Sequence, residues 1–159
     1  MRIAVLSDTH SRYQTVEAAL ALLEGKKVDL LIHCGDIDDA ETVWLFPPHT
    51  HFVFGNCDHD RASLRQAIHG IGATLHEPFG VLELDEAKIA FIHGDDARQL
   101  RELELSGFDY VFHGHTHQAA DRRNGNTRVI NPGALQRARV KTFVILDLAT
   151  GELQSIVVE

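Results

Sequence analysis

Histidine and aspartate recur in short motifs along this chain, at spacings that could build a metal site. The chain has 11 histidines among its 159 residues, and histidine is the commonest metal ligand in proteins. Imidazole, carboxylate and amide oxygen suit manganese, iron, cobalt, nickel or zinc, whereas magnesium usually takes carboxylates and water. The candidate motifs are Asp8-Thr9-His10, Gly35-Asp36, Gly55-Asn56, His93-Gly94 and His115-Thr116-His117.

Each motif follows a segment that the sequence predicts to be a strand. These segments are the apolar runs at residues 3–6, 30–32, 52–54, 88–92 and 110–112. Loops at the carboxyl ends of strands are where α/β folds place their sites. An Asp-x-His triplet or a Gly-Asp pair is common by chance, but the complete ordered set is not. We therefore interpret the motifs together as one metal-binding constellation.

The order of predicted elements indicates an α/β (α+β) fold. The first half alternates strands with helices, at residues 16–23, 41–45 and 61–68. The second half is mostly hairpins, with turns at Asp85-Glu86 and Asn124-Gly125-Asn126 and one helix at residues 97–105. Two late strands are expected near 142–146 and 153–157. This order favours two sheets with helices on their outer faces, in a single domain over residues 1–159.

Composition excludes several classes of function. The net charge is −8 and no long run of lysine or arginine occurs, so binding to long nucleic acid is not expected. No segment has the length of a signal-peptide core or a membrane span, so no membrane partner is expected. The two cysteines, Cys34 and Cys57, form no disulfide framework, which predicts a cytoplasmic protein.

The ordered motifs resemble those of the calcineurin-like metallophosphoesterase superfamily, and within it the small single-domain phosphodiesterases of the YfcE type. Gly55-Asn56-Cys57-Asp58 and Asn131-Pro132-Gly133 agree with that branch. The resemblance implies a four-layer αββα sandwich of two mixed sheets. It implies a hydrolase that cleaves small phosphodiesters by attack of a hydroxide bridging two divalent metal ions. Manganese is the first expectation for the metal, with nickel, zinc, iron or cobalt as alternatives.

The same resemblance assigns ligands to two ions. Those of the first ion are Asp8, His10, Asp36 and His117. Those of the second are Asp36, Asn56, His93 and His115. Asp36 would then bridge the ions.

The residues implied in catalysis are Asp36, Asn56, Cys57 and Asp58. Many larger members of the superfamily have histidine where this chain has Cys57, and a neutral thiol is a poor hydrogen-bond donor. We therefore expect a preference for diesters with good leaving groups, such as aryl esters. His59 is a possible substitute for the absent histidine. Asp58 is expected to orient a metal-binding histidine rather than to bind metal itself.

Several alternatives stay open at this point. Asn131-Pro132-Gly133 is either a structural turn or a turn that brings backbone groups near the metals. Arg12, Arg61 and Arg137 are candidates for contacting phosphate, or else solvated charges. The remaining histidines are expected at the surface, except His33 and His113, which should pack or form hydrogen bonds. A non-catalytic scaffold like the retromer subunit of this fold is the alternative function, and homo-oligomerisation is left open.

Overall fold

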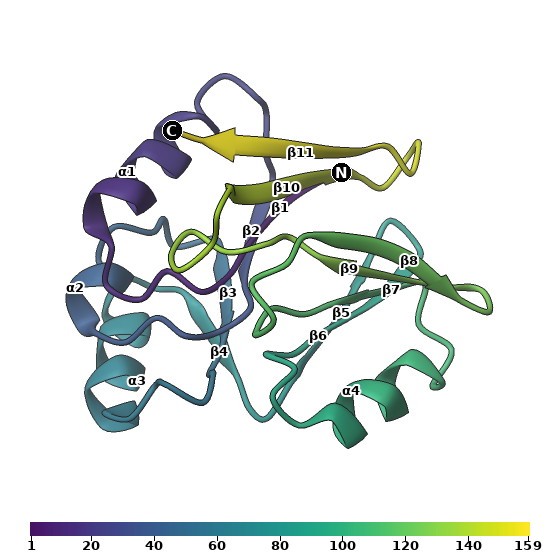
Figure 1. Ribbon diagram of the computed structural model, residues 1–159, viewed down its shortest axis with the longest axis horizontal. Coiled ribbons are helices and arrows are strands. Elements are labelled where there is room, and N and C mark those ends of the chain that lie inside the picture. The colour runs from purple at the N-terminus through teal and green to yellow at the C-terminus, as the bar shows by residue number, and fades with distance from the viewer.

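The first sheet joins both ends of the chain. The computed structural model describes all residues, 1–159, and this six-stranded sheet has the order β11-β10-β1-β2-β3-β4 (Figure 1). Its strands are β1 (Arg2–Leu6), β2 (Leu30–His33), β3 (Thr50–Val53), β4 (Thr74–His76), β10 (Lys141–Asp147) and β11 (Leu153–Val158). β1, β2, β3 and β4 run parallel to one another, whereas β10 is antiparallel to β1. The carboxyl ends of β1, β2 and β3 therefore lie at one edge.

The second sheet contains the hairpins of the later half. Its five strands have the order β5-β6-β7-β9-β8. They are β5 (Gly80–Leu84), β6 (Ala87–Phe91), β7 (Tyr110–Phe112), β8 (Ala120–Asn124) and β9 (Thr127–Asn131). β6, β7 and β9 are parallel, so the loops that follow β6 and β7 leave the same edge.

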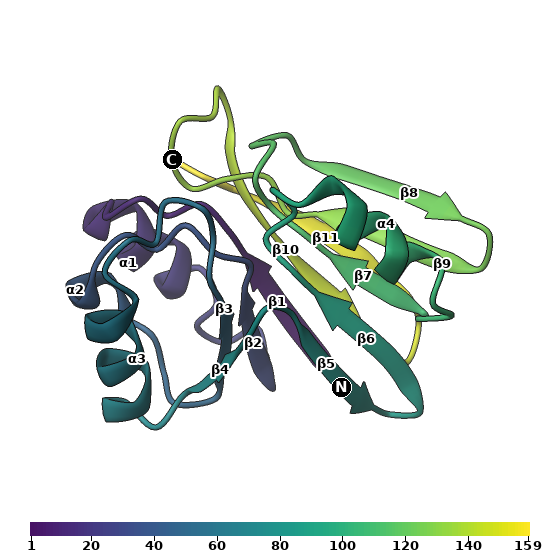
Figure 2. The same cartoon turned by 90° about the horizontal axis from the view of Figure 1, so that it is seen from below.

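Helices cover the outer faces of both sheets. α1 (Tyr13–Ala21), α2 (Ala40–Val43) and α3 (Arg61–Gly70) lie beside the first sheet, and α4 (Ala97–Glu104) lies on the second (Figure 2). Asp39, Asp60 and Asp96 cap α2, α3 and α4 with side-chain oxygens that accept backbone N–H bonds. Each of the four helices is too short or too polar to span a lipid bilayer.

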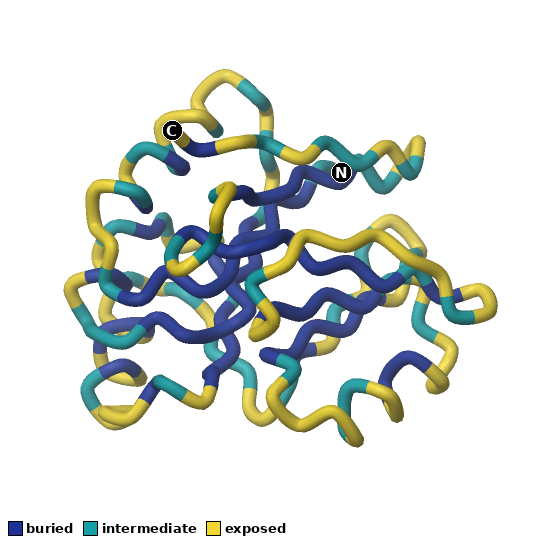
Figure 3. Tube along the Cα trace, viewed as in Figure 1, coloured by how far each residue is buried: buried dark blue, intermediate teal, exposed yellow.

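The core lies in layers, as the alternation along β1 illustrates. Ile3 and Val5 pack into a cluster between the sheets, with Phe91 and Phe112 of the second sheet. Ala4 and Leu6 face the opposite way, into the cluster beneath the helices. Buried backbone is therefore continuous through the centre, with exposed loops outside it (Figure 3). The arrangement is the αββα sandwich that the sequence predicted.

Two features differ from the sequence prediction. β4 was not expected, because its three residues, Thr74-Leu75-His76, carry no long apolar run. α1 begins and ends earlier than the predicted range 16–23: Leu22 caps it, and the chain turns before Gly25, which has φ +74°.

Candidate metal centre

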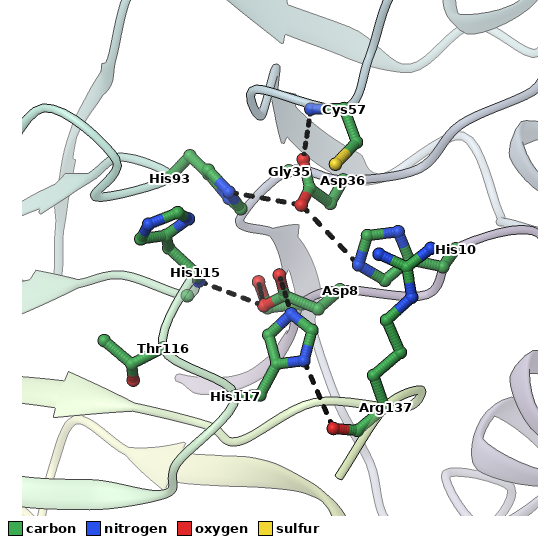
Figure 4. A network of polar contacts seen from close by, with 12 residues as sticks. Asp8, His10, Gly35, Asp36, Cys57, His93, His115, Thr116, His117 and Arg137 are labelled. Carbon is green, nitrogen blue, oxygen red and sulfur yellow. Dashed lines mark hydrogen bonds and ion pairs between the residues drawn. The ribbon is translucent and has the colours of Figure 1, made fainter.

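The predicted ligands converge from loops that follow separate strands. The loops after β1, β2, β3, β6 and β7 meet where the carboxyl ends of the two sheets face each other (Figure 4). Asp8, His10, Asp36, His115 and His117 all have positive φ, between 44° and 67°. Residues other than glycine seldom adopt this conformation, and such strain concentrates at functional sites.

One group of ligand atoms could hold a metal ion. Ligand atoms of Asp8, His10, Asp36 and His117 all lie within 4.8 Å of one another. Oδ1 of Asp8 and Nε2 of His10 are buried without a hydrogen-bond partner. Oδ1 of Asp8 nevertheless lies 3.1 Å from Nε2 of His117. Buried polar atoms normally have hydrogen-bond partners. Ligand atoms that lie close together without such partners are what a site for a shared cation would show.

The second group lies on the other side of Asp36. Nε2 of His93 is 3.4 Å from Oδ2 of Asp36 and 3.0 Å from Oδ1 of Asn56. The ring of His115 stands against that of His93, with 5.1 Å between the ring centroids. The side chains predicted for a second ion therefore also lie together.

Asp36 lies between the two groups. Its Oδ1 accepts a hydrogen bond from the backbone N–H of Cys57, at 2.8 Å. Its Oδ2 is 3.6 Å from Nε2 of His10 and 3.4 Å from Nε2 of His93. A Cβ atom at Gly55 would overlap Oδ1 of Asp36, so glycine is needed there for the carboxylate to hold this position.

The histidine rings are oriented from behind by oxygen acceptors. Nδ1 of His10 lies 3.2 Å from Asp38 Oδ2, and Nδ1 of His93 lies 2.8 Å from the Cys34 carbonyl oxygen. Nδ1 of His117 lies 3.4 Å from the carbonyl oxygen of Arg137. A proton on Nδ1 donates to each acceptor and leaves Nε2 free to bind metal. Sequence reasoning missed Asp38 and Arg137 in this role, although Asp38 is only two residues after Asp36.

Asp58 has a different role from the one predicted. It does not orient a histidine; its carboxylate accepts hydrogen bonds from backbone N–H groups. The donors are Asp36, Ile37, Asp38 and Gly55, at 2.7 to 3.0 Å. Asp58 thus fixes the loop of Asp36 against the loop of Asn56. Backbone donors are invisible in a sequence motif, which explains the wrong prediction.

His33 and His113 pack and form hydrogen bonds, as predicted. Nδ1 of His33 accepts from the backbone N–H of Gly35, so Nε2 carries the proton beside Thr9 Oγ1. Burial lowers the pKa of His33 to about 3.

Asn131 donates to the Gly114 carbonyl and to Thr116 Oγ1, which holds the loop of His115 and His117.

His51 and His76 contradict the prediction of surface histidines. They are partly buried, with Nδ1 of His51 2.9 Å from Nε2 of His76 and their rings stacked. The edge of each ring meets Phe91. His59 is exposed.

Asp36 and His93 shift each other's pKa. Burial raises the pKa of the Asp36 carboxyl, but the hydrogen bond and charge of His93 outweigh it and hold that pKa far below its usual range. Burial lowers the pKa of His93, whereas Asp36 raises it, to a net value of about 9. A metal ion binding here would displace the proton on His93.

Cys57 offers a neutral thiol at the edge of the centre. Burial and the nearby carboxylate of Asp36 raise the pKa of the thiol above its usual value. The thiol is therefore protonated near neutral pH and is a weak hydrogen-bond donor.

An αββα sandwich with clustered aspartate and histidine at its strand ends defines the class of two-sheet metallophosphoesterases. The chain belongs to the calcineurin-like phosphoesterase superfamily, whose family model matches residues 1–151. The chain is therefore a phosphoesterase, and its family implies divalent metal ions.

Individual proteins support this assignment. Phosphodiesterase MJ0936 of Methanocaldococcus jannaschii is 29% identical over 166 residues, which covers 100% of both chains. A solved archaeal phosphodiesterase is 28% identical with a TM-score of 0.91, covering 99% of this chain and 100% of that one.

Two more distant structures share the fold at 18% identity, with all of both chains covered. They are YfcE, a phosphoesterase from E. coli, with a TM-score of 0.77, and Vps29 from Entamoeba histolytica, with 0.69.

Proposed function

We propose that the chain hydrolyses small phosphodiesters at a pair of divalent metal ions. The proposed ligands are Asp8, His10, Asp36 and His117 for one ion, and Asp36, Asn56, His93 and His115 for the other. The supporting observation is that Oδ2 of Asp36 has an imidazole Nε2 on either side, at 3.6 Å and 3.4 Å. A bridging carboxylate needs this placement.

When bound, paired divalent ions lower the pKa of water and offset the charge of the phosphoryl oxygens. The protein's part is to hold the ligands rigidly. Asp38, the Cys34 carbonyl and the Arg137 carbonyl orient imidazoles, and Asp58 holds the loops of Asp36 and Asn56 together. Preorganised ligands avoid the cost of rearrangement during the reaction.

Cys57 indicates which leaving groups the proposed phosphodiester substrates carry. A neutral thiol with a raised pKa is a weak acid and a poor hydrogen-bond donor, so Cys57 gives a departing alkoxide less help than an imidazole would. Aryl and other acidic leaving groups, which need less help to depart, are therefore favoured. We infer a preference for diesters with such groups over alkyl esters.

Manganese is the proposed metal, with nickel, zinc, iron or cobalt as alternatives, because the donors are imidazole and oxygen. A cytoplasmic location, one domain over residues 1–159, no membrane partner and no binding to long nucleic acid stay predictions. Homo-oligomerisation stays open.

The alternative is a non-catalytic scaffold of the same fold. A scaffold has no chemical need for buried, unbonded ligand atoms such as Asp8 Oδ1 and His10 Nε2, so the hydrolase is favoured.

The test is hydrolysis of bis(4-nitrophenyl) phosphate by chelator-treated protein, before and after addition of Mn²⁺. We expect turnover only with the metal, and its loss in His117→Ala but not in Glu17→Gln, which changes an exposed helix residue. A metal-loaded protein that hydrolyses no phosphoester would favour the scaffold.

A further inference from the structure

Arg137 lies at the edge of the candidate metal centre with its backbone fixed. It follows β9 in the loop that leads to β10, and its φ of +55° is in the left-handed region. Its carbonyl oxygen lies 3.4 Å from Nδ1 of His117, whose Nε2 faces Asp8. The backbone of Arg137 is therefore held directly behind one predicted metal ligand.

The side chain of Arg137 extends from this loop toward the candidate ligands, and in this view its guanidinium lies over the ring of His10 (Figure 4). Arg137 is exposed, and its guanidinium takes part in no hydrogen bond or ion pair within the chain. It is a free cation at the mouth of the centre.

The other arginines considered for phosphate binding are engaged elsewhere. Arg61 lies over the ring of Phe54, 5.1 Å from its centroid, and donates to the carbonyl oxygens of Asp58 and Gly55 at 3.2 and 3.5 Å. Arg12 donates to Gln136 through Nε and Nη2, at 2.7 and 3.1 Å, when the Gln136 amide oxygen faces it. Arg137 is the candidate with all its side-chain donors unused.

We propose that the guanidinium of Arg137 binds the non-bridging oxygens of the substrate's phosphoryl group. This inference rests on the proposed function, because it assigns a contact in the same site. A guanidinium presents paired N–H donors that match phosphate oxygens, and it stays protonated near neutral pH. Arg137 thus neutralises phosphoryl charge but gives no proton to the leaving group.

The direct measurement is the affinity of the Mn²⁺-loaded protein for inorganic phosphate, by calorimetry, in Arg137→Ala and Arg137→Lys. We expect binding about 10- to 100-fold weaker in Arg137→Ala, with partial recovery in Arg137→Lys, because charged hydrogen bonds are lost and then partly restored. Metal content should not change, since any residue at position 137 keeps the carbonyl that faces His117. For bis(4-nitrophenyl) phosphate, kcat/KM should fall by a similar factor.

The matched control is Arg139→Ala, two residues further along the loop. Arg139 is also exposed and makes no hydrogen bond or ion pair within the chain, so this variant removes the same charge without the proposed contact. We expect its phosphate affinity to stay within about 2-fold of the parent protein, because Arg139 makes no proposed contact and salt screens exposed charges.

The outcomes separate this inference from the proposed function. Phosphate affinity unchanged in Arg137→Ala, or lowered equally in Arg139→Ala, overturns the inference. Metal-loaded protein that binds no phosphate overturns it as well. Phosphate binding that depends on Arg137, in a protein that hydrolyses no phosphodiester, supports the inference while the proposed function fails.

Discussion

The carboxylate of Asp38 lies 3.2 Å from Nδ1 of His10, so the far nitrogen of that ring points at Asp36. Both residues have positive φ, and each belongs to a different strand-end loop. The contact therefore fixes the ring and joins the two loops that carry the first proposed metal site.

Removing the Asp38 carboxylate should weaken metal binding without abolishing the fold. We expect Asp38→Ala to lower the affinity for Mn²⁺ by about 10- to 100-fold, as for other partners that orient a metal-binding histidine. Asp38→Asn keeps an oxygen acceptor and tolerates the positive φ of +78°, so its loss should be smaller. Metal titration of both variants checks this, with thermal unfolding to confirm that each is folded. Equal affinity in Asp38→Ala and the parent would refute the orienting role.

Asp36→Asn should be the most damaging single substitution. It removes negative charge from both proposed sites at once, while the amide keeps the size of the side chain. We expect a loss of both ions and a fall in kcat/KM of more than about 100-fold, because even partners of ligands contribute up to that factor. Elemental analysis and the aryl diester assay measure the two effects. Normal metal content and rate would show that Asp36 is not the bridge.

Cys57→His should change which esters are cleaved. An imidazole titrates near neutral pH and can donate a proton to a departing alkoxide, whereas a neutral thiol is a poor hydrogen-bond donor. We expect the ratio of monoesterase to diesterase activity, and of alkyl to aryl diester cleavage, to rise at least about 10-fold. Cys57→Ala, which adds no acid, is the control and should leave both ratios near those of the parent. Unchanged ratios in Cys57→His would remove the leaving-group argument.

The stacked pair His51 and His76 should make stability depend on pH. Burial and the neighbouring charge of His76 lower the pKa of His51 to about 4. This pKa in the folded chain lies below the pKa of about 6.5 in the unfolded chain. At pH values between these two, the unfolded chain therefore binds more protons than the folded chain. This contribution to the free energy of unfolding is complete above about pH 6.5 and is lost as the pH falls toward 4.

We expect His51→Phe, which cannot be protonated, to flatten this dependence. Because His51 is only partly buried, solvent screening limits the expected difference to about 1 kcal/mol between pH 7 and 4.5. Denaturant unfolding of chelator-treated protein measures it without interference from metal release. The exposed His69→Gln serves as control and should follow the parent. Identical pH profiles for the parent and His51→Phe would contradict the burial argument.

Local sequence predicted that the motifs after the strands gather at one edge, and the family resemblance supplied the ligand set. The apolar runs ended at Asp8, Asp36 and Asn56, and the carboxyl ends of parallel strands share one edge. The supporting contacts could not be predicted in the same way. Asp58 binds backbone N–H groups, and the acceptor behind His117 is a carbonyl, so neither partner leaves a side-chain signature.

Long-range pairing explains the rest of what the sequence did not reveal. The pairing of Ile3 with Leu146 places the last hairpin in the first sheet, and no local pattern specifies that partner. β4 is short and follows α3, and it is held as a strand by its parallel pairing with β3. Hydrophobic periodicity predicts that a strand exists, but the strand with which it pairs is determined by packing throughout the core.

The central claim is that two metal ions share Asp36. Anomalous diffraction from crystals of Mn²⁺-loaded protein tests it most directly. We predict two peaks about 3.5 to 4 Å apart, with Oδ2 of Asp36 between them. One peak alone, or ions bound away from Asp36, would contradict the account.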